Sequence, residues 1–195
     1  MELDVHATGD VELVVHHDPV LPGLGPIASL SWSRAASHRL SNGETVPTLA
    51  EALGLLKGLE VWVEVKALPP QVDQRLFATL DAGPTPGKYA VHSFDHRIIA
   101  RLGEHRPSLR RGVLLASYLL DPLAPITGTG ADTLWMDAQL IDQELVGLVQ
   151  DDGYEIIAWT ANQPAEIARL VTLGVDGICG NYPERIRDAL ARPRA

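Results

Sequence analysis

Four polar side chains have the types and spacing that suit a metal ion and an anionic substrate. Glu2 and Asp4 alternate with apolar residues, and so do Glu64 and Lys66. If both segments are strands, period-two alternation puts each pair on one face. Two carboxylates on one face repel each other unless a cation lies between them. Three carboxylates supply the oxygen ligands that Mg²⁺ or Ca²⁺ prefers, and Lys66 beside them suits an anionic substrate.

A second group of residues offers proton transfer. His16, His17 and Asp18 end the next apolar segment, so a histidine here is a candidate general acid or base. Taken separately, these patterns are more often a solvated strand face, a surface ion pair or a turn. The seven histidines show no zinc-like spacing, which argues against a zinc enzyme. The aromatic residues, Trp159 and Phe94 among them, would by default pack in the core or under loops.

Short β-branched segments alternate with segments of helical periodicity, which predicts a parallel sheet covered by helices. The clearest helix start is Thr48 with Glu51, which form a capping box. A short basic helix is expected after Pro183. The predicted strands cover residues 2–6, 11–16, 61–66, 88–92, 112–116, 133–137, 155–160 and 175–179.

This order fits two α/β architectures, an open doubly wound sheet and a (β/α) barrel. No Gly-x-Gly-x-x-Gly follows a predicted strand, which weakens the dinucleotide-binding open sheet. A strand that turns Glu64 and Lys66 to one side at its C-terminal end fits a barrel delivering residues to its active-site mouth. The first two strands are close enough to form a hairpin-like excursion. Residues 19–47 are predicted to be a long irregular stretch, and a loop of this length is usually functional or mobile. No repeat or boundary divides the chain, so one domain is expected over residues 1–195.

Composition narrows the function classes. The chain has 195 residues, of which 46% are hydrophobic and 21% charged, so a folded domain is expected. A formal charge of −9 argues against nucleic acid or an anionic membrane as the main partner. A single cysteine, Cys179, excludes an internal disulfide. No transmembrane segment is evident and Met1 is followed by acidic residues instead of a signal peptide, so a cytoplasmic protein is expected.

Taken in order, the motifs resemble the glycerophosphodiester phosphodiesterase family. The matching stretches run through nearly the whole chain, from residue 2 to about residue 187. They are Glu-Leu-Asp-Val at 2–5, Val-Val-His-His-Asp-Pro at 14–19, Val-Pro-Thr-Leu-Ala-Glu-Ala-Leu at 46–53, Val-Glu-Val-Lys at 63–66, Ser-Phe at 93–94, Trp-Thr-Ala-Asn at 159–162 and Gly-Val-Asp-Gly-Ile at 174–178.

The resemblance implies a TIM-type (β/α) barrel, an Mg²⁺ or Ca²⁺ site, and hydrolysis of a small-molecule glycerophosphodiester to glycerol 3-phosphate and an alcohol. It implies that His17 is one of two catalytic histidines and that Lys66 binds a phosphate oxygen of the substrate. The metal ligands it implies are Glu2, Asp4 and Glu64, and the residues lining the substrate pocket are Phe94 and Trp159.

The chain also departs from the family pattern. Family members open with a strand carrying His-Arg-Gly, whose histidine is the second catalytic one, followed by a helix. This sequence starts at the next strand, so the barrel is expected to be incomplete at its N-terminus. Near the other end, Cys179, Gly180 and Asn181 replace the more usual Thr-Asp and a third residue.

Three explanations for the start are open. Met1 could be a misread GTG valine codon with further coding sequence upstream, which we favour. The chain could instead be a truncated, catalytically inactive relative that binds a metal or phosphate. It could also work with another histidine in the missing role, such as His16 or His92. A related phospholipase D or phosphatidylinositol phospholipase C on the same barrel is the rival enzyme. An in-frame His-Arg-Gly in the upstream DNA would favour the enzyme, and a stop codon there would favour the inactive relative.

Overall fold

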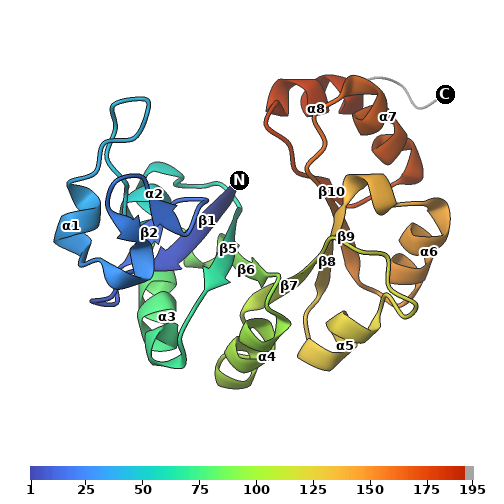
Figure 1. Cartoon of the computed structure of the whole chain (residues 1–195). Coiled ribbons are helices and arrows are strands. Elements are labelled where there is room, and N and C mark those ends of the chain that lie inside the picture. Colours follow the sequence, from blue (N-terminus) through green and yellow to red (C-terminus); the bar gives the residue numbers. More distant parts are fainter. Residues whose placement is uncertain (192–195) are drawn as a thin grey trace. The chain divides into compact units, whose positions relative to one another are not determined.

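The structure is a computed structural model that describes residues 1–191. The chain groups into two compact units, residues 1–110 and residues 111–195. Both have alternating strands and helices, as the sequence predicts (Figure 1). The expectation of one domain over 1–195 stays a prediction.

The first unit is built on four strands in the spatial order β6-β5-β1-β2. β1, β5 and β6 are parallel, while β2 returns antiparallel to β1 with Val5 opposite Val15. The predicted hairpin-like excursion is therefore confirmed. The strands are β1 (Glu2–Ala7), β2 (Leu13–Val15), β5 (Val61–Ala67) and β6 (Tyr89–Ser93).

Helices of this unit pack against its strands and against each other. α2 begins at the predicted capping box: Thr48 Oγ1 accepts from the Glu51 amide at 3.1 Å, and Glu51 Oε2 accepts from the Thr48 amide at 2.8 Å. α3 and α4 are joined by a buried ion pair, with Arg101 Nε 2.8 Å from Asp73 Oδ2. The helices are α2 (Leu49–Leu55), η2 (Pro70–Val72), α3 (Asp73–Ala82), η3 (Pro86–Lys88) and α4 (His96–His105).

Residues 19–47 differ from the irregular stretch expected. They form a small sub-structure with its own core, in which Leu21, Ile27, Ala35 and Val46 pack with Val14 of β2. Its elements are β3 (Val20–Leu21), β4 (Gly25–Pro26), η1 (Ile27–Ser29) and α1 (Trp32–Ala36). The apolar residues are widely spaced between Pro, Gly and Ser, so they show no periodicity in the sequence.

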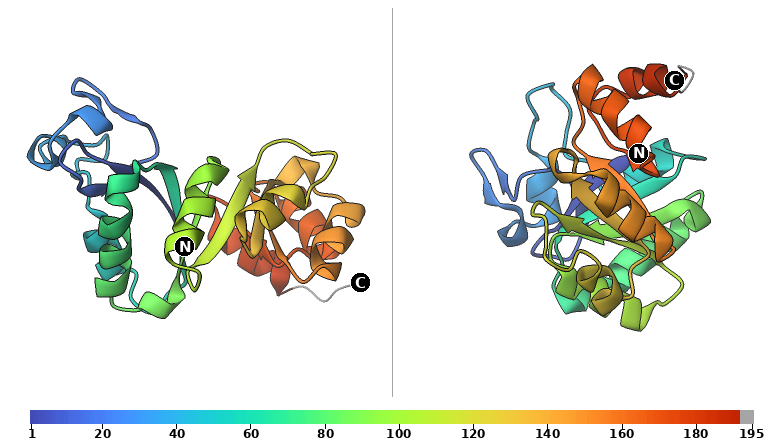
Figure 2. Two further views of the ribbon diagram at one scale, coloured as in Figure 1. Left: turned by 90° about the horizontal axis from the view of Figure 1, so that it is seen from below. Right: turned by 90° about the vertical axis from the view of Figure 1, so that its right-hand side faces the viewer.

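The second unit has parallel strands in the order β10-β9-β8-β7, with helices such as α6 packed against them (Figure 2). Gly180, which follows β10, packs closely against the backbone of Ala161. A Cβ at this position would overlap the Ala161 carbonyl. The remaining elements are β7 (Arg110–Leu115), α5 (Ala124–Thr129), β8 (Thr133–Asp137), η4 (Ala138–Leu140), α6 (Gln143–Asp151), β9 (Glu155–Trp159), α7 (Pro164–Leu173), β10 (Gly177–Ile178) and α8 (Pro183–Leu190).

Candidate functional site

The acidic residues of β1 and β5 meet because the two strands are in register. Asp4 lies opposite Glu64, and Glu64 lies opposite His92 of β6. Residues in register on neighbouring strands project to the same face, so these three side chains and Glu2, two residues from Asp4, share a face. The alternating residues project to the other face, where Val65 is fully buried.

Glu2, Asp4 and Glu64 form one acidic cluster. One carboxylate oxygen of each residue lies within 4.8 Å of the others. Glu2 Oε1 is buried and makes no hydrogen bond within the described residues. Burial, with the neighbouring charge of Asp4, raises the pKa of Glu2 to about 7. Burial likewise raises the pKa of Glu64. The cluster therefore has the oxygen donors and the electrostatic need for a hard divalent cation, so its residues fit Mg²⁺ or Ca²⁺.

Lys66 places a positive charge next to the acidic cluster. Its Nζ lies 2.9 Å from Asp4 Oδ1 and 2.6 Å from Glu64 Oε1. Burial alone would lower the pKa of Lys66, but hydrogen bonds to Glu64 and Asp4 outweigh it and raise the pKa. Lys66 is therefore held charged beside the carboxylates, where an anionic group could reach it.

His17 follows β2 at the same end of the site. The His16 amide donates to the Asp4 carbonyl at 3.0 Å, and His6 Nε2 donates to the His17 carbonyl at 3.2 Å. His17 Nδ1 lies 2.8 Å from Asp18 Oδ1, and this contact lowers the pKa of Asp18. The His17 side chain is 74% exposed. Because Asp18 holds Nδ1, Nε2 is left to exchange a proton with a substrate.

His92 is the member of the site that sequence analysis offers only as a substitute for a missing histidine. It is 1% exposed, and its Nε2 lies 3.5 Å from Glu2 Oε1. Its ring meets the Trp62 ring edge-on at 5.5 Å. Burial lowers the pKa of His92 to about 3, so the imidazole is neutral at physiological pH. In the sequence, the signal for His92 is its position directly before Ser93 and Phe94 at the end of a predicted strand. Its proximity to Glu64 depends on the register between β5 and β6, which the sequence does not show.

The two aromatic residues expected in the substrate pocket lie in different units. Phe94 directly follows β6 and is 46% exposed. Trp159 ends β9 in the second unit and is partly buried. Their role in binding substrate stays a prediction.

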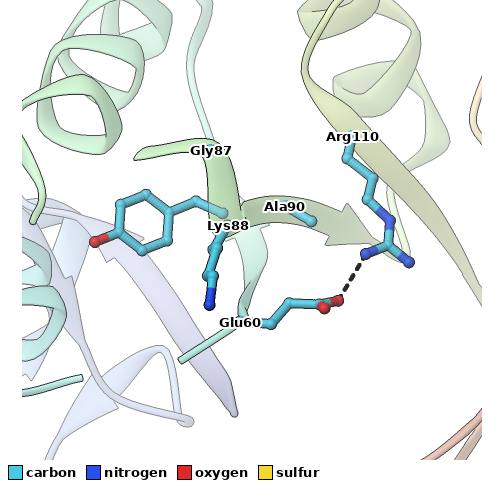
Figure 3. Close-up of a pocket in the computed structure, with 6 residues that line it drawn as sticks. Glu60, Gly87, Lys88, Ala90 and Arg110 are labelled. Carbon is cyan, nitrogen blue, oxygen red and sulfur yellow. Dashed lines mark hydrogen bonds and ion pairs between the residues drawn. The ribbon is translucent and has the colours of Figure 1, made fainter. Parts of the chain in front are cut away.

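Two pockets open at opposite ends of β5. One, of about 430 Å³, lies beside Lys66, between the residues that follow β5 and the start of α4. The other, of about 160 Å³, lies where β5 and β6 begin (Figure 3). In the second pocket Arg110 Nη1 is 2.6 Å from Glu60 Oε1, and Lys88 Nζ donates to the Gly58 carbonyl at 2.9 Å. These contacts occupy the charged groups of the second pocket within the fold, while the first pocket shares Lys66 with the acidic cluster. Within residues 1–191, no helix is both long and apolar enough for a membrane span.

Relatives match along almost the whole chain. A glycerophosphodiester phosphodiesterase of Caldanaerobacter subterraneus subsp. tengcongensis is 27% identical over 203 residues, covering 95% of this chain and 83% of the relative. One of Bacillus subtilis is 26% identical over 216 residues, covering 94% of this chain and 74% of the relative.

Solved structures give the same result for the fold. An Oleispira antarctica phosphodiesterase in complex with the product sn-glycerol-3-phosphate matches with a TM-score of 0.91 at 20% identity, covering 98% of this chain and 84% of that chain. A glycerophosphodiester phosphodiesterase from Parabacteroides distasonis matches with a TM-score of 0.85 at 24% identity, covering 97% of this chain and 82% of that chain. The predicted TIM-type α/β fold class is confirmed.

A sequence model of the Glycerophosphoryl diester phosphodiesterase family matches residues 1–185. This range includes both strands of the acidic cluster, the histidines that follow β2, and Trp159. The chain belongs to the glycerophosphoryl diester phosphodiesterase family.

Proposed function

We propose that this chain is a metal-dependent phosphodiesterase that hydrolyses a glycerophosphodiester to glycerol 3-phosphate and an alcohol. The observation that carries the proposal is the convergence of Glu2, Asp4 and Glu64, with ligand oxygens within 4.8 Å, next to the charged Lys66. Three carboxylates this close are costly to keep ionised unless a cation joins them. Family membership supplies the reaction class.

Glu2, Asp4 and Glu64 would hold Mg²⁺ or Ca²⁺. When bound, such an ion neutralises negative charge on phosphoryl oxygens. Glu64 is the most buried of the three ligands, at 7% exposed, so it is the most firmly positioned. His92 Nε2, 3.5 Å from Glu2 Oε1, borders the ligand that has no hydrogen bond within the described residues.

Lys66 would bind a phosphate oxygen of the substrate. Its Nζ lies between two carboxylates, so an ammonium that already faces the site needs only to exchange one anionic partner for another. Fixed positive charge that meets the growing charge of the transition state lowers the barrier.

His17 would donate a proton to the departing alcohol oxygen. Hydrolysis breaks the bond between phosphorus and that oxygen, and water supplies the new oxygen on phosphorus. The carboxylate of Asp18, 2.8 Å from Nδ1, orients the ring and leaves Nε2 to act as the proton donor. The proposal also includes Phe94 and Trp159 as residues that contact the substrate.

The test is release of glycerol 3-phosphate from glycerophosphoglycerol with Mg²⁺, with Ca²⁺ and with chelator. We expect metal-dependent release by the wild-type chain and a loss of at least 100-fold in Glu64→Gln, since one of three ligands is removed. Glu44→Gln, an exposed carboxylate outside the cluster, is the matched control. A folded chain that binds metal without any turnover would contradict the proposed activity and favour the inactive relative.

A further inference from the structure

His6 is a buried histidine on β1 that the proposed chemistry does not use. It is 7% exposed and lies two residues from Asp4, so the two side chains project to the same face of β1. Its Nε2 lies 3.2 Å from the carbonyl oxygen of His17. Because a carbonyl oxygen can only accept, Nε2 carries the proton of this hydrogen bond. The strand that holds Glu2 and Asp4 is therefore bonded through a side chain to the residue proposed as the acid.

The side chain of His17 has little around it to hold it in place. His17 and Asp18 are 74% and 71% exposed at their side chains. Their 2.8 Å contact orients the imidazole relative to Asp18, but it joins two exposed neighbours in the sequence and ties neither of them to β1. The distance of the His17 ring from the acidic cluster therefore depends on the backbone that carries the ring.

Hydrogen bonds from residues 16 and 17 join this backbone to β1. β2 ends at Val15, and the next amide, that of His16, donates to the Asp4 carbonyl at 3.0 Å. This is a backbone bond, so every residue except proline can make it at position 16. The bond to the His17 carbonyl depends instead on the side chain of His6. His6 is therefore the side chain through which the sequence fixes the position of His17.

The alternative is that His6 only helps to close the hairpin of β1 and β2. The two strands are already paired from Val5 with Val15 to Ala7 with Leu13, and Val5 and Leu13 are buried. A buried polar side chain costs stability unless it is hydrogen-bonded, so an apolar residue could close the hairpin as well. The donor on Nε2 matters for the residue it bonds, which is His17.

We propose that His6 is a positioning residue, which holds His17 where that residue can protonate the departing alcohol oxygen. The inference rests on the proposed function, because it takes His17 to be the proton donor. In this account His6 acts only through the carbonyl of His17 and has no contact with the substrate.

The test uses two substitutions that differ in reach, His6→Gln and His6→Asn. The glutamine amide nitrogen lies about as far from the backbone as Nε2, so it keeps the donor, whereas asparagine is one methylene shorter and withdraws it. Both are made in the wild type and in His17→Gln. Asp73→Asn, at a buried polar residue outside the site, is the control for lost stability.

The values of kcat and KM are measured in Mg²⁺ with glycerophosphoglycerol and with a glycerophosphodiester of p-nitrophenol, whose leaving group needs no proton. His6→Asn should lower kcat for glycerophosphoglycerol about 10- to 100-fold, because a misplacement of about 1 Å can cost 100-fold. KM and the rate with the p-nitrophenol diester should change little. His6→Gln should restore most of the lost rate.

In the His17→Gln background, His6→Asn should cause no further loss, because two residues that act through one group are not additive. Asp73→Asn should leave kcat for both substrates close to that of the wild type. The bond itself is checked without any substitution by ¹⁵N NMR of the imidazole rings of the wild-type chain, where we expect the proton of His6 on Nε2.

Equal rates for His6→Asn and His6→Gln, or equal losses with the two substrates, would overturn the inference while turnover by the wild type leaves the proposed function intact. A His6 proton found on Nδ1 alone would overturn it even if neither variant folds. A loss in Asp73→Asn that is as large and as selective would overturn it as well. No glycerol 3-phosphate released from either diester by the wild type would overturn the proposed function, and the inference with it.

Discussion

At the scale of single residues, the carboxyl groups of the site differ in how deeply they are buried. Glu2 and Glu64 are carboxyls whose pKa values burial raises, while the pKa of the exposed Asp18 is lowered by its contact with His17. The buried groups therefore suit a cation, and the exposed pair suits proton exchange with a substrate.

His17→Gln should lower kcat for glycerophosphoglycerol by about 10²–10⁴-fold, because it removes the proton donor to an alkoxide leaving group. The loss should nearly vanish for a glycerophosphodiester of p-nitrophenol, whose leaving group needs no proton. Rates with the two substrates check this prediction, and His16→Gln is the control because its Nδ1 faces the Asp18 carbonyl. An equal loss with both substrates would remove His17 from the role of acid.

The raised pKa of Glu2 predicts a pH dependence of stability in chelator. Its ordinary value is 4.5 and its value in the fold is about 7, so the folded chain holds this proton more tightly than the unfolded chain. The contribution of Glu2 to the free energy of unfolding is therefore complete below pH 4.5 and is lost as the pH rises to about 7.

His6 and His92 act in the opposite direction, since burial lowers their pKa values. The measurement is therefore the difference between urea unfolding of the wild type and of Glu2→Gln from pH 5 to 8. The wild type should lose stability relative to the variant across this range, and a parallel pair of curves would contradict the prediction. Saturating Mg²⁺ should reverse the trend, because it binds the ionised form.

Much of the site could be predicted from alternation alone. Glu2, Asp4, Glu64 and Lys66 alternate with apolar residues, and two strands that pair in parallel bring such faces together. His92 could not be placed in the same way. Its neighbours in the sequence are apolar or small, and only the pairing of β5 with β6 puts it opposite Glu64.

At the scale of elements, two ion pairs made by carboxylates of α3 differ in their burial. Asp73 is buried and paired with Arg101, whereas Asp81, on the same helix, is 55% exposed and paired with Arg106. A buried charge left without its partner costs far more than an exposed one.

Asp73→Asn should therefore lower the free energy of unfolding by about 3 kcal/mol. Asp81→Asn, which breaks the corresponding exposed pair, should change it by less than about 1 kcal/mol. Urea unfolding of both variants at pH 7 measures the difference. Equal losses would show that burial of Asp73 does not determine the strength of this contact.

Local chemistry predicts some elements well and others poorly. The start of α2 is predicted by Thr48 and Glu51, because a capping box depends on only four consecutive residues. The sub-structure over residues 19–47 was not predictable in this way. Leu21, Ile27 and Val46 form its core from separate short elements, and only tertiary packing brings them together.

At the scale of the whole molecule, the first unit supplies all but one of the predicted site residues. Trp159 belongs to the second unit, at the end of β9. The net charge of −9 is consistent with the proposed binding of an anionic substrate through a metal ion and Lys66 instead of a basic surface. The central claim is that the acidic cluster binds the divalent cation on which hydrolysis depends.

The most direct test is calorimetric titration of the chain with Mg²⁺ and with Ca²⁺, together with glycerol 3-phosphate release at each level of saturation. The account predicts one ion per chain, release that rises in proportion to occupancy, and loss of both in Glu64→Gln. Saturable binding that Glu64→Gln leaves unchanged, or release that persists in chelator, would contradict it.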